Sequence, residues 1–238
     1  MLKTALETIS CLVFPKICET CLEILPAQDV RGVCLRCLGS IRKIAPPFCP
    51  NCGRSAIYKN SRCGQCRDTG FYFDHVYAAA YYEGKMQELL QSYKFKGRKF
   101  LKTFLSELLT EFISNHLHSS DFDAVLSVPM EARKENERGF NQSLLLSRLV
   151  SKKIQRPDLS AFVGRKKLKH AQSLLNKNQR AENISGSFAI KNSQPYFEKN
   201  LLLVDDILTT GFTASECSKT LKTAGARSVT VLAVARGL

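Results

Sequence analysis

The sequence predicts an α/β fold with an open, mostly parallel sheet, preceded by a small double zinc ribbon of two four-cysteine sites. Three observations support this prediction. Four Cys-x-x-Cys pairs lie within residues 18–66. From residue 73 onward, short apolar runs alternate with stretches whose apolar residues recur every three or four positions, as in helices. Residues 201–204 are all apolar, as expected of a central parallel strand that is buried on both faces.

Length and composition fit a folded chain of one or two domains. The 238 residues are 44% hydrophobic and 24% charged, which excludes wholesale disorder. The apolar stretches are far shorter than the ~20 residues of a membrane span. Residues 1–14 lack the continuous apolar core of a signal peptide and predict a short amphipathic helix, so we expect a cytoplasmic location. We predict two domains: residues 1–72, with the N-terminal helix and the double ribbon, and residues 73–238, with the α/β fold.

The net charge of +14 favours anionic partners such as phosphates, nucleic acid or acidic lipid. Two Zn²⁺ ions bound by four thiolates each would lower this charge to about +10. The chain therefore stays basic even when both predicted metal sites are filled.

The cysteines divide the chain, because nine of the ten precede residue 67. Two residues between paired ligands allow a tight turn to direct both sulfurs at one ion, and two such turns complete a tetrahedral site. We predict two structural Zn²⁺ ions with sequential pairing, which closes the shortest loops, while a cross-braced pairing remains the alternative. A disulfide scaffold would require an oxidising compartment, and a redox motif would not occur four times. The predicted ligands are Cys18, Cys21, Cys34, Cys37, Cys49, Cys52, Cys63 and Cys66.

The second part of the chain predicts alternating strands and helices. Asn141 is a suitable N-cap for one helix and Gly225 a suitable end for another. Such an order gives a parallel sheet, whose ligands bind beyond the carboxyl ends of the strands. The predicted strands are 73–82, 124–128, 159–163, 186–190, 201–204 and 228–234, and the predicted helices are 84–93, 100–117, 142–154 and 213–224.

Residues 201–213, LLLVDDILTTGFT, carry the strongest chemical signal. The backbone N–H groups of residues 209–213 would converge at a helix N-terminus, where they can bind a phosphate, and Gly211 permits close approach of the anion. Asp205 and Asp206 would repel a phosphate, so we expect them to accept hydrogen bonds from sugar hydroxyls or to hold the water ligands of Mg²⁺. This combination suits a ribose 5-phosphate, and the alternative is a solvated loop.

This segment resembles the signature of type I phosphoribosyltransferases, which bind phosphoribosyl pyrophosphate (PRPP). Further motifs narrow the resemblance to the ComF/GntX family, whose ComF members are associated with natural transformation. The resemblance covers nearly the whole chain and includes the double ribbon, Lys94-Phe-Lys-Gly97, Val128-Pro129, Arg138-Gly-Phe-Asn-Gln142, Gln172 and Arg180.

The resemblance implies a site for PRPP with Mg²⁺. Asp205 and Asp206 would contact the ribose hydroxyls, and Thr209, Thr210, Gly211, Phe212 and Thr213 would surround the 5-phosphate. The pyrophosphate loop would comprise Val128, Pro129, Met130 and Glu131. Arg138 follows that loop and suits a diphosphate, although a surface role is the alternative. Residues 164–180 occupy the place of a mobile loop that closes over the site.

The basic stretch between residues 148 and 180 predicts contact with single-stranded DNA. It holds ten Lys and Arg residues against one acid, although Phe162 is its only aromatic residue. A solvated charged face is the alternative. The candidate contacts are Arg165, Lys166, Lys167, Lys169, Lys177 and Arg180.

The leading functional hypothesis is a ComF-type competence protein of DNA uptake that binds PRPP and single-stranded DNA, together with DNA-processing proteins as partners. The rival is an orthodox phosphoribosyltransferase of nucleotide metabolism, with the ribbon as a structural module. No acceptor pocket is recognisable in the sequence, so transfer to an unknown acceptor and binding of PRPP without catalysis both stay open, and no catalytic residue is assigned.

Overall fold

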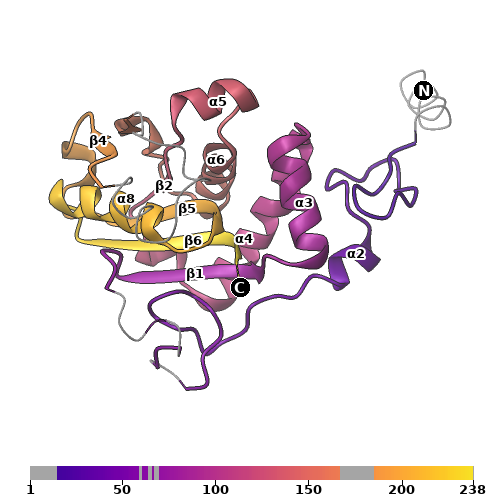
Figure 1. Cartoon of the computed structure of the whole chain (residues 1–238), viewed down its shortest axis with the longest axis horizontal. Helices are drawn as coiled ribbons and strands as arrows, with labels where there is room; N and C mark the ends of the chain where they lie inside the picture. The colour runs from indigo at the N-terminus through magenta and orange to yellow at the C-terminus, as the bar shows by residue number, and fades with distance from the viewer. Residues whose placement is uncertain (1–14, 59–60, 64–65, 67–69, 167–184, 238) are drawn as a thin grey trace.

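The computed structural model describes residues 15–58, 61–63, 66, 70–166 and 185–237 (Figure 1). The predicted helix at residues 1–14 and most of residues 164–180 lie outside these ranges. The helices are α2 (Leu35–Gly39), α3 (Gly84–Phe95), α4 (Lys102–His116), α5 (Ala132–Arg138), α6 (Gln142–Ile154) and α8 (Phe212–Thr223). The strands are β1 (His75–Tyr81), β2 (Ala124–Ser127), β3 (Val163–Arg165), β4 (Phe188–Ile190), β5 (Asn200–Leu208) and β6 (Ser228–Arg236).

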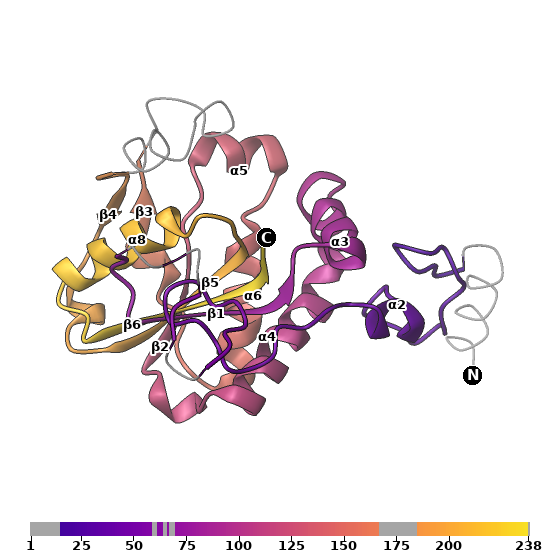
Figure 2. The same ribbon diagram turned by 60° about the horizontal axis from the view of Figure 1, so that its bottom comes forward.

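Four strands form one sheet in the order β1-β6-β5-β2, and every neighbouring pair in it is parallel. The strands β3 and β4 pair antiparallel in a separate two-stranded sheet beside α8 (Figure 2). This arrangement confirms the predicted open, mostly parallel α/β fold. The order places β5 and β6 in the middle of the sheet, where both faces of each strand are covered.

Side chains of the central strands alternate between two hydrophobic cores, since successive residues of a strand point to opposite faces. Leu202 and Val204 of β5 belong to the core with α3, α4 and α6, whereas Leu201 and Leu203 belong to the core with α8 and the β3–β4 sheet. All four side chains are completely buried. The unbroken apolar run in the sequence is therefore explained by burial on both faces.

The prediction of a strand at residues 159–163 was wrong in its position. Ser160–Phe162 form a 3-10 turn, and the strand begins only at Val163. The turn is stabilised by Asp158, whose Oδ1 accepts a hydrogen bond from the Ser160 backbone N–H at 3.0 Å. Ser160 Oγ in turn accepts a bond from the backbone N–H of Ser127 at 2.8 Å. These side-chain bonds override the strand propensity of the apolar residues around them.

Two further differences concern element boundaries. The strand predicted at residues 201–204 extends to Leu208, so the two aspartates belong to the strand itself. The short helix α5 is not predicted from the sequence, because its residues, ARKENER, are polar on all sides and give no apolar periodicity. Asn141 caps α6 as predicted, since its Oδ1 accepts a hydrogen bond from the Leu144 backbone N–H at 3.1 Å.

The segment between the two cysteine groups pairs with the free edge of β1. The Ile44 N–H donates to the Ala79 carbonyl, and the Tyr81 N–H donates to the Arg42 carbonyl, both at 3.0 Å. Ile44 is also buried in the core with α8. Residues that precede the predicted boundary at residue 72 thus complete one edge of the sheet.

We expect a chain that begins at residue 73 to be less stable than one that begins at residue 40. Loss of the Ile44 side chain and of two backbone hydrogen bonds should lower the free energy of unfolding by about 3 kcal/mol. For a domain of this size, that corresponds to a melting temperature lower by about 6–12 °C. Calorimetry of both chains measures the difference, and equal melting temperatures would show that residues 73–238 are an independent folding unit.

Candidate functional site

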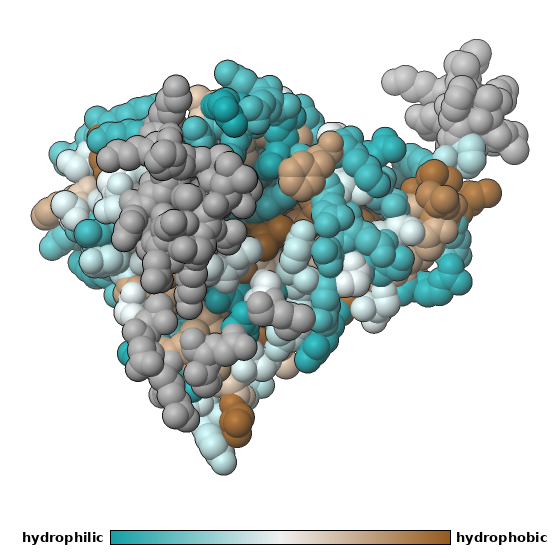
Figure 3. Space-filling model, in the orientation of Figure 1, coloured by the Kyte–Doolittle hydropathy of each residue, from teal (hydrophilic) through white to brown (hydrophobic). Residues whose placement is uncertain are grey.

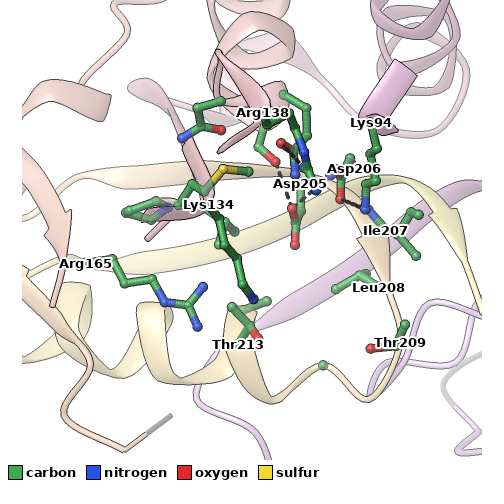
Figure 4. Close-up of a pocket in the computed structure, with 18 of the residues that line it drawn as sticks. Lys94, Lys134, Arg138, Arg165, Asp205, Asp206, Ile207, Leu208, Thr209 and Thr213 are labelled. Atoms are coloured by element: carbon green, nitrogen blue, oxygen red, sulfur yellow. Dashed lines mark hydrogen bonds and ion pairs between the residues drawn. The ribbon is translucent and has the colours of Figure 1, made fainter. Parts of the chain in front are cut away.

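A cavity of about 210 Å³ opens at the carboxyl ends of β2 and β5 (Figure 4). Parallel sheets bind ligands at this edge because loops and helix N-termini converge there. Side chains and backbone from six elements line the cavity: α3, α5, α6, β3, β5 and α8. Its lining contains Val128, Pro129, Met130, Arg138, Asp205, Asp206, Thr209, Thr210, Gly211 and Thr213 of the predicted site.

The turn from β5 into α8 has the geometry of an anion site. Gly211 precedes the helix with a φ of +84°, a conformation that strains any residue with a Cβ atom. No hydrogen bond between described residues uses the backbone N–H groups of residues 209–213. These donors lie at the N-terminus of a 12-residue helix, where the helix dipole favours negative charge. Phe212 does not line the cavity, and its ring lies 6.0 Å from that of Phe71.

The two aspartates of β5 have different partners. Asp206 is buried, and its Oδ1 pairs with the Lys94 Nζ at 3.0 Å. The Ile207 backbone N–H donates to the same oxygen at 2.6 Å, while Oδ2 has no hydrogen-bond partner among the described residues. Asp205 accepts a hydrogen bond from Ser143 Oγ at 2.9 Å. One buried carboxylate oxygen of the pair therefore lacks a partner among the described residues.

Burial and, secondarily, the neighbouring charge of Asp206 raise the pKa of Asp205 to about 7, while Lys94 acts in the opposite direction. Asp205 consequently changes its charge near neutral pH. A protonated Asp205 donates one hydrogen bond, whereas the ionised form only accepts them. The hydrogen-bonding character of the cavity floor thus depends on pH.

Four cationic side chains line the cavity, against two carboxylates: Lys94, Lys134, Arg138 and Arg165. Burial, and secondarily the charge of Arg165, lowers the pKa of Lys134. Burial also lowers the pKa of Arg165, whose Nε and Nη2 atoms are buried without a hydrogen-bond partner among the described residues. Cations held in partly desolvated positions attract anions strongly. The excess of positive charge suits a ligand with several negative charges.

Arg138 lies at the rim of the cavity. Its Nη1 donates to Gln142 Oε1 at 2.5 Å, and its guanidinium lies 5.2 Å from the ring centroid of Phe95. Glu131 is the last residue of the predicted pyrophosphate loop. It is buried just before α5 and does not line the cavity. Ten of the twelve residues predicted for the PRPP site and the pyrophosphate loop thus line the cavity, whereas Glu131 and Phe212 do not.

Several lining residues were not singled out as site residues by sequence reasoning. Lys134 and Ser143 lie outside any recognised motif, and only their position after the β2 strand could have suggested them. Lys94 appeared only as part of a family motif without a role. Arg165 was predicted to contact DNA, and the structure places it in the cavity wall. Lys166 is exposed, and Lys167, Lys169, Lys177 and Arg180 lie outside the described residues.

The eight cysteines form two groups, each with its four sulfur atoms within 4.8 Å of one another. The groups are Cys18, Cys21, Cys34 and Cys37, and Cys49, Cys52, Cys63 and Cys66, which is the predicted sequential pairing. The Sγ atoms of Cys21 and Cys34 are 3.5 Å apart, and those of Cys52 and Cys63 are 3.6 Å apart. A tetrahedron with Zn–S bonds of about 2.3 Å has edges of about 3.8 Å. The geometry therefore fits a double zinc ribbon.

Backbone N–H groups support a thiolate in each group. The Cys34 N–H donates to Cys18 Sγ at 3.4 Å, and the Cys63 N–H donates to Cys49 Sγ at 3.2 Å. Such bonds stabilise negatively charged sulfur, the form that binds metal. Both groups supply four protein ligands, so each is suited to a structural ion and leaves no open position for catalysis.

Two arginines lie near the second group, and one of them bonds it to the end of the sheet. Arg54 Nη2 donates to the Gly237 carbonyl at 2.7 Å, just beyond β6. Arg236 is buried, and its burial lowers the pKa of the guanidinium, whereas the nearby Cys52, Cys66 and Cys63 raise it. Four thiolates around one Zn²⁺ carry a net charge of about −2, which would compensate the buried guanidinium.

Similarity searches identify relatives that extend over most of the chain. The chain is 29% identical to Competence protein F of Haemophilus influenzae over 211 residues, covering 86% of this chain and 90% of that protein. It is also 29% identical to DNA utilization protein YhgH of Escherichia coli K12 over 230 residues, covering 95% of this chain and 100% of that protein. The resemblance to the ComF family is confirmed. Competence protein ComFC of Streptococcus pneumoniae is 28% identical and covers 90% of this chain and 91% of that protein.

No protein-family model matches the chain. Among solved structures, the glutamine PRPP amidotransferase of B. subtilis aligns with a TM-score of 0.41 and 15% identity, covering 60% of this chain and 30% of that chain. The allosteric regulatory enzyme of purine biosynthesis aligns with a TM-score of 0.39 and 16% identity, covering 56% of this chain and 26% of that chain. The assignment of the α/β fold and of its cysteine-rich N-terminal part rests on the parallel sheet, the turn into α8 and the two cysteine groups. No helix of the described residues has the length and apolar character of a membrane span.

We expect the purified protein to contain two Zn²⁺ ions per chain, and Cys18→Ser and Cys49→Ser to lose one each. The Cys49→Ser variant should melt at a temperature about 5 °C lower than Cys18→Ser, because loss of the second ion leaves Arg236 buried without a compensating charge. Elemental analysis and calorimetry measure the two effects. A metal content below two, or equal melting of both variants, would contradict this assignment.

Proposed function

We propose that the cavity binds PRPP together with Mg²⁺, and that the chain acts as a ComF-type protein in DNA uptake and contacts single-stranded DNA. The observation that carries this proposal is the turn at residues 209–213, whose unused N–H groups lie beside two carboxylates and four cations. Phosphate donors next to hydroxyl acceptors match a phosphorylated sugar. The additional cations match a second, more highly charged group such as a diphosphate.

Different lining residues would contact three parts of the ligand: the 5-phosphate, the ribose and the diphosphate. The 5-phosphate would occupy the turn at residues 209–213, and the ribose hydroxyls would contact Asp205 and Asp206. The diphosphate would lie toward Val128–Met130, where Lys134 and Arg138 also line the cavity. This arrangement separates each phosphate group from the carboxylates and places it beside donors. It agrees with the roles that the family resemblance implies.

The donor set of the cavity also fits Mg²⁺. The ion prefers carboxylate oxygen and keeps several water ligands, often together with substrate phosphates. Asp206 Oδ2 is a buried oxygen without a partner among the described residues, and Asp205 lies directly beside it in the sequence. These two residues would hold the ion through its waters, and its charge would neutralise the diphosphate.

Support for a role in DNA uptake comes from the relatives and from charge. Proteins similar over nearly their whole length are named competence and DNA utilization proteins. The net charge of +14 supplies the attraction for a polyanion. If a phosphoribosyl group is transferred, a nitrogen nucleophile would form a bond to C1′ while the bond from C1′ to pyrophosphate breaks. The cations of the cavity would stabilise the departing pyrophosphate. Pyrophosphate release with free bases or with DNA distinguishes such an enzyme from a protein that only binds PRPP.

We expect Asp206→Asn to weaken binding of PRPP with Mg²⁺ at least about tenfold, because it removes a carboxylate from the cavity. Isothermal titration calorimetry measures the affinity, and circular dichroism verifies that the variant is folded. Asp121→Asn, at an exposed position outside the cavity, should bind as the wild type does. Equal affinity of wild type and Asp206→Asn would remove this residue from the site.

The affinity for PRPP should rise between about pH 6 and pH 8. Burial and Asp206 raise the pKa of Asp205 to about 7, so deprotonation in this range creates an additional acceptor for the ribose hydroxyls and Mg²⁺. Titrations at pH 6, 7 and 8 measure the trend. The Asp205→Asn variant serves as the control, because it lacks this carboxyl group and retains the pH dependence of the ligand's phosphates and of the other cavity residues. Identical pH dependence of both proteins would contradict this role of Asp205.

For the DNA contact, we expect a variant with Gln at Lys166, Lys167 and Lys169 to bind single strands less tightly at low salt. Each substitution should reduce the log–log salt slope by up to ~0.7. Fluorescence anisotropy of a labelled oligonucleotide at several salt concentrations gives this slope. Lys199→Gln, which removes an exposed charge elsewhere, is the control. An unchanged slope in the triple variant would exclude these lysines from the DNA contact.

A further inference from the structure

The connection between α3 and α4, residues 95–102, has a composition unlike a structural turn. Its sequence, FKGRKFLK, contains four cations, two aromatic residues and no acid. Phe95 is 73% exposed and Phe100 is 41% exposed, although both are large and hydrophobic. We call residues 95–102 the basic linker. Figure 3 shows hydrophobic surface over the upper end of α3 and over the N-terminal part of the chain, with hydrophilic surface between them.

The aromatic rings of the basic linker are held in place by contacts with neighbouring segments. The guanidinium of Arg138 lies 5.2 Å from the Phe95 ring centroid. Phe100 lies against Gly32 of the first cysteine region, where a Cβ atom would be only 2.2 Å from the ring. Arg98 pairs with Glu19 of the same region at 3.4 Å. The rings are thus positioned on the surface in advance, with part of each ring accessible to a ligand.

The basic linker also connects two concave surfaces. Lys94, the residue before Phe95, lines the phosphate cavity. On the other side, Lys96, Arg98 and Phe100 line a groove of about 650 Å³ that the first cysteine region completes. The groove has apolar walls, including Ile17 and Val30. Its two acids, Glu19 and Asp29, form ion pairs with arginines of the same part of the molecule. A chain-like ligand could therefore extend from the groove, along the basic linker, to the rim of the cavity.

We propose that the basic linker is a binding site for single-stranded DNA, with bases stacked on Phe95 and Phe100 and phosphates beside Lys96 and Lys99. Proteins that bind single strands combine cations along the backbone with aromatic rings on which bases stack. The concentration of positive charge favours a polyanion over an apolar peptide segment as the occupant. This inference rests on the proposed DNA contact and adds to it a second location, outside residues 165–180.

Tryptophan fluorescence provides a direct test, because the chain contains no tryptophan. Phe95→Trp introduces a single fluorophore into the basic linker, and titration with a 12-residue oligothymidylate should quench it, since stacking brings a base onto the indole. Phe197→Trp is the matched control. Phe197 is 62% exposed and packs on Gly225, at the end of the molecule where β6 begins. Its fluorescence should not change.

Affinity measurements test the energetic contribution of the same residues. Phe95→Leu retains an apolar contact with Arg138 but removes the aromatic face, and it should weaken binding of the oligonucleotide about tenfold. Lys96→Gln should reduce the log–log salt slope by ~0.7, whereas Lys199→Gln should leave it unchanged. Phe95→Trp should retain the wild-type affinity.

The outcomes separate this inference from the proposed function. One outcome contradicts the inference: Phe95→Leu and Lys96→Gln bind the oligonucleotide as tightly as the wild type does, and Phe95→Trp is not quenched. The DNA contact would then lie elsewhere. If the wild type does not bind the oligonucleotide at all, the proposed DNA contact fails as well. Quenching at Phe95→Trp alone, with the expected loss of affinity in Phe95→Leu, supports the site.

Discussion

The ion pair between Lys94 and Asp206 connects the cavity at the end of β5 with α3, the helix that leads into the basic linker. A buried carboxylate at the end of the central strand requires a partner, because an uncompensated buried charge costs several kcal/mol. Lys94 supplies it from α3 at 3.0 Å, and thereby fixes the end of that helix at the cavity. Phe95 follows directly in the chain, so the same pair determines where the basic linker begins. The cavity and the linker are therefore parts of one surface.

The distribution of charge within the cavity suits the proposed ligand, which carries both phosphates and sugar hydroxyls. The cationic side chains come from α3, α5 and β3, whereas both carboxylates come from β5. The turn at residues 209–213 contains no acidic side chain, and the two carboxylates precede it on β5. Because Asp205 has a pKa of about 7, the acidic part of the cavity gains charge as the pH rises.

The two cysteine groups lie in a segment that is small for an independently folded domain. A segment of about 50 residues between Lys16 and Cys66 is too small to bury enough apolar surface to fold unaided, and a metal ion bound by each cysteine group would supply the missing free energy. The first group packs beside the basic linker, where Gly32 and Glu19 contact Phe100 and Arg98. The second lies against the sheet through Arg54 and the edge segment at Ile44. Each group consequently shapes a different surface of the α/β part.

Local chemistry in the sequence determined much of this protein. The spacing of the cysteine pairs requires ligand turns, the apolar run at residues 201–204 requires burial on both faces, and the small residues after it require a tight turn at a helix N-terminus. Asn141 was predicted as a cap for the same reason, since capping involves only the next three residues. Each of these predictions depends on neighbours in the chain, and the structure confirms each one.

The tertiary structure alone decided which distant residues complete the site. Lys94, Ser143 and Arg165 reach the aspartates or their cavity only because α3, α6 and β3 pack around the end of β5. Arg165 was thus predicted from charge density to face DNA, whereas its burial in the cavity wall depends on the pairing of β3 with β4. The 3-10 turn at Ser160 is likewise set by its bond to the backbone of Ser127, 33 residues away in the sequence. Contacts of this kind depend on packing between elements, which has no periodic signal in the sequence.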